Sequence, residues 1–421
     1  MATTAFDIGN YGAAFKQVIE PDIQDNIPKK TKLLQVLKTN DETQFFNNNF
    51  YFAVRSSRHG GVTNLANPTR KLVTGQSNVI QGTIAPKYVT ATFDISDVVV
   101  KASQGDKAAV ESAMSFQTRT IKNDFSKQLN RQYWSDGVGV IAQAGSVGAG
   151  TLSITYPGGT APDDTRGDIS GWFGPINYDS KPSKWFTEGQ IIGVGTAGAD
   201  FGTITTVSGG SALGTLVVTG DPAIVALDSV YISDGDNTAL GTSEIQGIRS
   251  ALTVGTATTY AGLTISTNDT WQAQYMGTSA NGALTINDMD TVYMSAVEYA
   301  EDGDKYAWFV NKSLYAKYGE LLTALRRTVN KVDLVSGWSG LEFAAGQGNV
   351  PVMLDFDTPD GEAVLLNLDT WTVCEIAPMG FIEDGMLRRS DYITFQKVFT
   401  WYTNLACRAP AANGRMLRRT K

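Results

Sequence analysis

Apolar and polar residues recur with a helical period over the longest patterned stretch of the chain, which predicts one helix from Asp106 to Tyr133. Its apolar stripe comprises Val110, Ala113, Met114, Ile121, Phe125, Leu129 and Tyr133. The opposite face carries Lys107, Glu111, Arg119, Lys122, Lys127 and Arg131. At 1.5 Å per residue the helix would span about 40 Å. It is therefore either one long core helix of an α+β domain or a spine that carries separate subdomains, with Val110, Met114, Ile121, Phe125 and Leu129 as its core positions.

A period of two appears on both sides of a long polar segment before this helix. Residues 50–54 place Phe50, Phe52 and Val54 on one side and Tyr51 and Ala53 on the other, and residues 89–95 alternate apolar and polar positions. Both stretches contain β-branched and aromatic residues, which predicts that they form paired strands. The connection from Arg55 to Lys87 is longer than most loops of a compact domain, and such loops are usually functional. A two-stranded hairpin is only marginally stable alone, so we expect this one to pack on something outside its own domain.

The middle of the chain has a different pattern and a different composition. Short strand-like runs at residues 190–194, 203–207, 215–218 and 229–232 are separated by glycine-rich turns, which predicts a small barrel or sandwich. Residues 136–283 hold four Lys and Arg against thirteen Asp and Glu, a net charge of −9, which leaves +1 for the rest of a chain whose total is −8. The same segment holds 26 of the 43 glycines. We therefore expect a separate β-rich unit, and a carbohydrate-binding or adhesive role for it stays open.

Helical and strand periods then alternate to the end of the chain. Two helices are predicted, over residues 289–300 with Asn287 or Asp288 as its cap and from Asn311 to residue 325. Strands are predicted at 306–310, 350–355, 363–368, 372–376 and within 392–409. Helices interleaved with strands around one sheet indicate an α/β or α+β domain.

The residues that carry catalytic or metal chemistry are few. His59 is the one histidine and lies in a glycine-rich loop, and no phosphate- or dinucleotide-binding motif is present, so we expect no catalytic residue, no metal and no cofactor. Cys374 and Cys407 are expected to be buried free thiols. The acidic groups at 355, 357, 360 and 362 are interpreted as a turn between two strands, and those at 234–237 as a solvated turn. No apolar run is long enough to span a membrane and no secretory segment is visible.

Several segments in a fixed order resemble one known family. Residues 348–355, then Pro359 to Gly361, then 366–371 look like its late strand pair, and 382–389 is similar to the turn that follows. Residues 401–405 with Pro410, Asn413 and Gly414 resemble its last strand and tail. The family is the major capsid proteins of tailed bacteriophages, with the Hong Kong ninety-seven type fold. The resemblance covers about 270 residues, and the middle segment is similar to a β-barrel insertion that some members carry.

The resemblance implies a fold class and a set of domains. The class is α+β: an N-terminal arm, an extended hairpin loop, a spine helix, peripheral and apical domains, and an inserted small β-barrel. The corresponding bounds are 1–48 for the arm, 49–96 for the hairpin, 97–135 for the spine, 136–283 for the insertion, 284–380 for the mainly apical domain, and 381–421 for the return strands and tail.

The resemblance also implies a function and partners. The chain would be a shell subunit that assembles with itself as hexamers and pentamers into an icosahedral virion head in the host cytoplasm, enclosing double-stranded DNA without sequence-specific binding. Arg58, Arg70 and Lys71 in the hairpin loop would contact a neighbouring subunit, and a scaffold, a portal and cement or decoration proteins are further partners. The acidic charge fits a wall that encloses DNA without adhering to it. The alternatives are an encapsulin-like nanocompartment shell and a secreted adhesin or carbohydrate-binding β-protein.

Overall fold

In the computed structural model the structure describes residues 31–37, 39–40, 45–62, 64, 74–103, 113–137, 139–148, 151–155, 182–195, 200–208, 215–219, 228–232, 244–253, 259–264, 271–276, 282–324, 332–333, 339–345, 348–359, 361–382, 387–388, 393–417 and 419–420. No helix in these ranges is long and apolar enough to cross a membrane.

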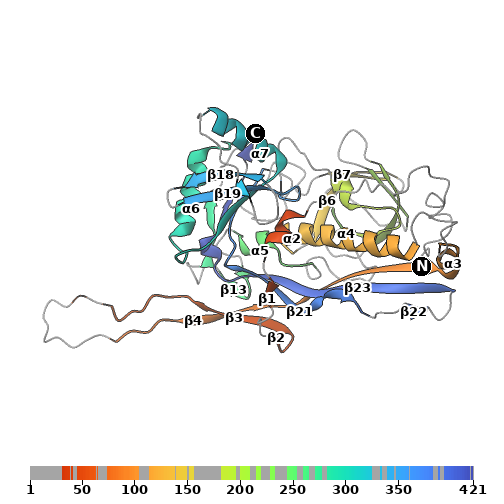
Figure 1. The fold of residues 1–421 in the computed structure, drawn as a ribbon, viewed down its shortest axis with the longest axis horizontal. Coiled ribbons are helices and arrows are strands. Elements are labelled where there is room, and N and C mark those ends of the chain that lie inside the picture. Colours follow the sequence, from red (N-terminus) through yellow and green to blue (C-terminus); the bar gives the residue numbers. More distant parts are fainter. Residues whose placement is uncertain are drawn as a thin grey trace.

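The predicted spine is helix α4 (Ala113–Trp134), which lies along a long, mainly antiparallel sheet (Figure 1). That sheet contains β1 (Thr39–Asn40), β5 (Lys87–Ser96), β21 (Trp371–Phe381), β22 (Leu387–Arg388) and β23 (Thr394–Cys407). On the helix, Phe125 is buried with its ring 4.9 Å from that of Phe399, and Leu129 is fully buried. Ile121 is half-buried. Val110, the side chain of Met114 and the predicted helix start at Asp106 lie outside the described residues.

A second sheet carries two helices. Its strands, in spatial order, are β14 (Gln274–Met276), β24 (Gly414–Met416), β20 (Ala363–Asn367), β16 (Tyr306–Val310), β19 (Gly348–Leu354), β18 (Ser339–Ala345) and β17 (Val332–Asp333). Helices α6 (Ile286–Val297) and α7 (Lys312–Ala324) cover it, and Met289, Val292, Leu314 and Tyr318 enter its core. We call this unit the apical sheet.

The sequence predicted the start of α7 correctly but not the cap of α6. Asn311 caps α7, because its Oδ1 accepts a hydrogen bond from the Leu314 amide at 2.9 Å. The cap predicted for α6 is wrong: Thr285 Oγ1 accepts from the Asp288 amide at 3.1 Å, so the helix begins before Asn287. Thr285 has the extended backbone of a cap residue, whereas Asn287 and Asp288 already lie in the first turn.

The middle segment forms a closed barrel with the strand order β10-β7-β6-β11-β8-β9. The strands are β6 (Val140–Gly148), β7 (Thr151–Thr155), β8 (Ile191–Val194), β9 (Asp200–Ser208), β10 (Thr215–Thr219) and β11 (Ser229–Ile232). The four predicted runs coincide with β8 to β11, which confirms them, and closure selects the barrel over the sandwich. Strands β6 and β7 were not predicted. The turn expected at residues 234–237 lies outside the described residues.

The pairing predicted for the hairpin is wrong. Strand β3 (Asn49–Arg55) pairs with β4 (Val79–Ile84), and β2 (Phe45–Phe46) extends the same small sheet. Strand β5 instead pairs along its whole length with β23. Gly82 explains why β4 is hard to see in the sequence: the Phe52 ring occupies the space of a side chain there, since an added Cβ would lie 2.5 Å from that ring.

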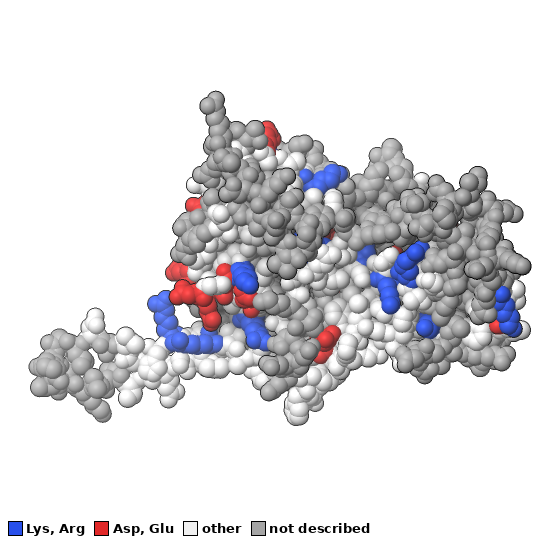
Figure 2. Space-filling model, in the orientation of Figure 1, with Lys and Arg blue, Asp and Glu red and all other residues white. Residues whose placement is uncertain are grey.

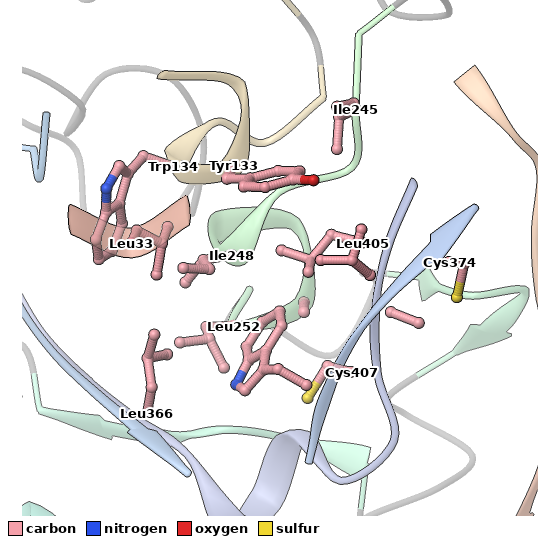
Figure 3. Packing of buried hydrophobic residues seen from close by; sticks show 14 of the residues in the cluster. Leu33, Tyr133, Trp134, Ile245, Ile248, Leu252, Leu366, Cys374, Leu405 and Cys407 are labelled. Carbon is pink, nitrogen blue, oxygen red and sulfur yellow. The ribbon is translucent and has the colours of Figure 1, made fainter. Parts of the chain in front are cut away.

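The remaining short elements join these units around one core. They are α2 (Lys32–Val36), α3 (Asp97–Ser103), α5 (Ile248–Ala251), β12 (Thr259–Tyr260), β13 (Leu263–Thr264), β15 (Gly282–Ala283), β25 (Arg419–Thr420) and the 3₁₀ turns η3 (Pro182–Trp185) and η6 (Pro410–Ala412). Figure 3 shows Leu33, Trp134, Ile248, Leu252 and Leu405 converging from four segments, α2, α4, α5 and β23. Cys374 and Cys407 are buried free thiols, as predicted.

Candidate assembly interface and the junction behind it

The hairpin β3–β4 is anchored at one end and open at the other. Phe50 and Ile84 are buried in the main core, and Phe52 stacks on Trp271 with ring centroids 6.2 Å apart. Farther out, Val79 and Val62 are 62% and 87% exposed. Figure 1 shows the two strands projecting away from the rest of the molecule. The described outer part of the hairpin therefore leaves apolar residues uncovered by the rest of the described chain.

The hairpin loop is shaped by glycines that approach one another closely. An added Cβ at Gly75 would lie 2.0 Å from the Gly61 nitrogen, so no larger residue fits there. The Asn78 amide donates to Ser57 Oγ at 2.9 Å, and the Gly61 amide donates to His59 Nδ1 at 3.1 Å. The sole histidine is therefore exposed and engaged with its own loop backbone.

The structure places one of the three predicted contact residues on the hairpin. Arg58 is exposed at the start of the loop, whereas Arg70 and Lys71 lie outside the described residues. Figure 2 shows charged side chains of both signs where the hairpin joins the body, and a mostly uncharged described surface on the hairpin in this view. The described part of the hairpin therefore offers apolar and backbone contacts more than charge.

Exposed apolar side chains also occur on α3, directly after β21 and directly before β23. Val98 is 56% exposed, Ile382 56% and Ile393 67%. The Asp97 amide donates to the Ile393 carbonyl at 3.2 Å, which brings α3 beside the start of β23. Sequence reasoning missed this patch, because each of its residues comes from a different segment.

Behind these surfaces, buried charges join the spine helix to the apical sheet. Lys127 Nζ donates to both carboxylate oxygens of Asp357 at 2.7 and 2.6 Å, and Asn130 Nδ2 donates to Asp357 Oδ2 at 2.6 Å. Asn130 also approaches Asp355 at 3.3 and 3.4 Å. We call Lys127, Asn130, Asp355 and Asp357 the junction.

The inserted barrel contacts the same helix through cations. Lys127 Nζ lies 5.6 Å from the Trp185 ring centroid and the Arg131 guanidinium 5.9 Å from it. Arg131 also pairs with Glu244, which follows the last barrel strand, β11, in the chain. The face of the spine helix that carries Lys127 and Arg131 is therefore covered rather than solvated.

The acidic cluster is a turn between β19 and β20, as predicted, but its carboxylates are buried. Glu362 accepts from Arg415 Nε and Nη2 at 3.0 and 2.8 Å and pairs with Arg249 at 3.2 Å. Burial, and secondarily the charge of Asp357, raise the pKa of Asp355 to about 6. Asp360 lies outside the described residues, and no group of acidic, Cys or His residues in the described part of the chain could hold a metal.

Comparison with known proteins bears on the fold. No protein-family model matches the sequence, and no curated protein matches it. In the capsid asymmetric unit of Cyanophage A-1(L), a chain matches with a TM-score of 0.53 at 12% identity, covering 95% of this chain and 96% of that one. This protein has the fold of a phage capsid protein. The predicted α+β fold class of a phage capsid protein is thereby confirmed, and the closed six-stranded barrel is compatible with the inserted β-barrel expected from the sequence, whereas residues 1–30 of the expected arm lie outside the described residues.

Two weaker similarities do not bear on that assignment. The capsid of a native GTA particle matches with a TM-score of 0.49 at 10% identity, over 100% of both chains. The holo-SrpI encapsulin complex of Synechococcus elongatus PCC 7942 matches with 0.47 at 10% identity, over 100% of this chain and 97% of that one.

Proposed function

We propose that this protein is a major capsid protein that assembles with itself, as hexamers and pentamers, into an icosahedral head enclosing double-stranded DNA. The observation that carries the proposal is the hairpin: its base is locked in the core by Phe50 and Ile84, while Val62 and Val79 are left uncovered. The capsid-protein fold supports the same conclusion.

The two ends of the molecule support assembly with copies of the same chain. The hairpin lies at one end of the molecule and α3, which carries the exposed Val98, lies at the other (Figure 1). Different surfaces at opposite ends favour heterologous contacts, which close into rings when the rotation between subunits allows it. The protein would then belong to the virion and be made in the host cytoplasm, with a scaffold, a portal and decoration proteins as partners.

The proposed domains follow the sequence: arm 1–48, hairpin 49–96, spine 97–135, insertion 136–283, apical 284–380 and return strands 381–421. Within them, Arg58, Arg70 and Lys71 are proposed to contact a neighbouring subunit. Because an encapsulating shell needs no reaction centre, no enzymatic activity is part of the proposal.

The test is electron microscopy and light scattering of the purified protein. Rings or closed particles tens of nanometres wide support the proposal, and nucleic acid rather than enzyme cargo inside them separates a virus head from a nanocompartment. A chain that remains monomeric both alone and when co-expressed with the scaffold encoded beside it would refute it.

The proposed contact residues are tested by charge reversal in the same assay. Changing Arg58, Arg70 and Lys71 to Glu is expected to leave the monomer folded and to abolish particles. A control with the same change in net charge replaces Arg119, Lys122 and Lys312, which are exposed on the body. Equal loss of particles in both variants would mean that net charge, and not the hairpin loop, is responsible.

A further inference from the structure

The described part of the arm contains one very short helix, α2, whose first amides are held by two side chains of the body. The Leu33 amide donates to Asp355 Oδ2 at 3.0 Å, and the Leu34 amide donates to Asn130 Oδ1 at 3.3 Å. Leu33 itself is fully buried in the main core. Five residues are too few for a helix to be stable alone, so α2 depends on these contacts.

The two junction carboxylates are held very differently. Asp357 receives a cation, Lys127, on both oxygens. The donors that reach Asp355 are neutral: the Leu33 amide, the Asp357 amide at 2.9 Å and Asn130 Nδ2. Of the pair, Asp355 is therefore the carboxylate that gains more from neutralisation by a proton.

We propose that Asp355, next to Asp357, is a proton-operated latch for the arm: uptake of one proton strengthens the docking of α2, and its release weakens it. The inference does not depend on the capsid function. It rests on the position of Asp355, which is 1% exposed and lies directly under the Leu33 amide.

The charged groups around Asp355 come from each element packed on it. Asp357 precedes β20 in the same turn, Lys127 lies on α4, and Lys32 lies on α2 itself. Burial and Asp357 raise the pKa of Asp355, while the Asp357 and Leu33 amides and Lys127 oppose that rise. Burial lowers the pKa of Lys32, although the Asp355 charge opposes this.

The direction of the pH effect follows from the raised pKa. When α2 leaves, solvent reaches Asp355 and its pKa falls toward the ordinary value of 3.8. Docking is therefore strongest below the ordinary pKa and weakens as the pH rises through about 6. If the whole rise in the pKa of Asp355 were lost on opening, the equilibrium constant for opening of α2 would be about tenfold larger at pH 8 than at pH 5, so tenfold is the upper limit of the effect. Acidic pH therefore favours the docked state of α2.

The experiment is hydrogen–deuterium exchange of the full chain between pH 5 and 8, read on peptides covering residues 31–37. Rates are divided by those of the same peptide unfolded, which removes the intrinsic pH dependence of exchange. In the wild type, opening is expected to rise across this range by up to about tenfold, with a midpoint near pH 6. In Asp355→Asn, which does not titrate at this position, the profile is expected to be flat and protected throughout.

Two further variants make the result specific. Asp369→Asn is a matched control, because Asp369 also accepts a backbone amide, that of Lys305 at 2.9 Å, but is exposed. It is expected to keep the wild-type profile. Asp357→Asn removes the neighbouring negative charge and is expected to move the midpoint to lower pH, which tests the latch even where Asp355→Asn does not fold. A wild-type profile that is flat, or a step that persists in Asp355→Asn, would overturn the proposal.

Discussion

The spine helix and the hairpin differ in which of their side chains are exposed. In the second half of α4 two charged residues are covered: Arg131 is fully buried and Lys127 nearly so. On the hairpin even apolar residues are open, with Val62 at 87% exposure. In folded proteins, charged residues are normally exposed and large apolar residues are normally buried.

The difference shows where each feature finds its partner. The spine helix is covered from within the chain, by the long sheet, the junction turn and Trp185 of the insertion. Buried ion pairs add little net stability, but removing one member is costly, so they fix how these units sit on the helix. The hairpin has no such cover within the described residues beyond its base, which is consistent with cover by another subunit.

The largest expected effect comes from placing the same new charge in each region. Phe125→Asp would bury a carboxylate in the core and lose the ring contact with Phe399, at a cost of at least about 5 kcal/mol, comparable to the whole stability of a domain. Val62→Asp would leave the exposed hairpin folded with an unchanged melting temperature. Soluble yield and circular dichroism check both variants, and a well-folded Phe125→Asp protein would contradict the packing of the spine.

The next effect in size concerns the junction. Lys127→Ala would leave Asp357 buried without its cation and is expected to cost about 3–5 kcal/mol in the free energy of unfolding. For the cycle the single changes are Lys127→Met and Asp357→Leu. The double variant Lys127→Met with Asp357→Leu removes both charges and should cost much less than the sum of these two single changes. Denaturant unfolding of the four proteins forms a double-mutant cycle, and strict additivity would show that the pair does not interact.

The sequence predicted regular elements well where the local pattern of apolar residues alone decides which positions are buried. Strand β16 is buried at every position and was predicted at its observed bounds, and the alternating residues of β5 form a strand as expected. What the sequence pattern did not reveal is the partner of each element. The run in β5 was paired with β3, whereas it pairs with β23, about 300 residues later in the chain.

The junction shows the same limit for charged residues. Lys127 and Arg131 fall on the polar face of the helical pattern, which by itself predicts solvent. Their burial depends on Asp357 and Glu244, which arrive from two other segments, and no local pattern encodes that meeting. The acidic turn was predicted as a turn for local reasons, while its role as a buried partner is a tertiary property.

A smaller effect is expected where the hairpin packs on itself. Gly82→Ala would place a Cβ 2.5 Å from the Phe52 ring, so the ring must shift on Trp271, at a cost of about 1–2 kcal/mol. Gly60→Ala is the matched control in the loop, since its nearest contact would be Gly75 Cα at 3.9 Å. Exchange of β3 amides should rise in Gly82→Ala alone, with the apical sheet unchanged. If the β3 amides exchange equally fast in both variants, the Phe52 ring does not lie over Gly82.

The smallest effect on stability separates the two regions most sharply. Phe46 is 74% exposed on β2, whereas Phe50, on the neighbouring strand, is fully buried. Phe46→Ser is therefore expected to change the free energy of unfolding by less than about 0.5 kcal/mol, as for most surface substitutions. Phe50→Ala is expected to cost about 3–5 kcal/mol.

If the hairpin side of the molecule is covered by another subunit, Phe46→Ser should nonetheless weaken self-association measured by light scattering, because an exposed aromatic of this size gains most when a partner buries it. Unchanged association would mean that this end of the hairpin sheet faces solvent in the assembled shell, and the contact would then have to lie farther out, around Val62 and Val79.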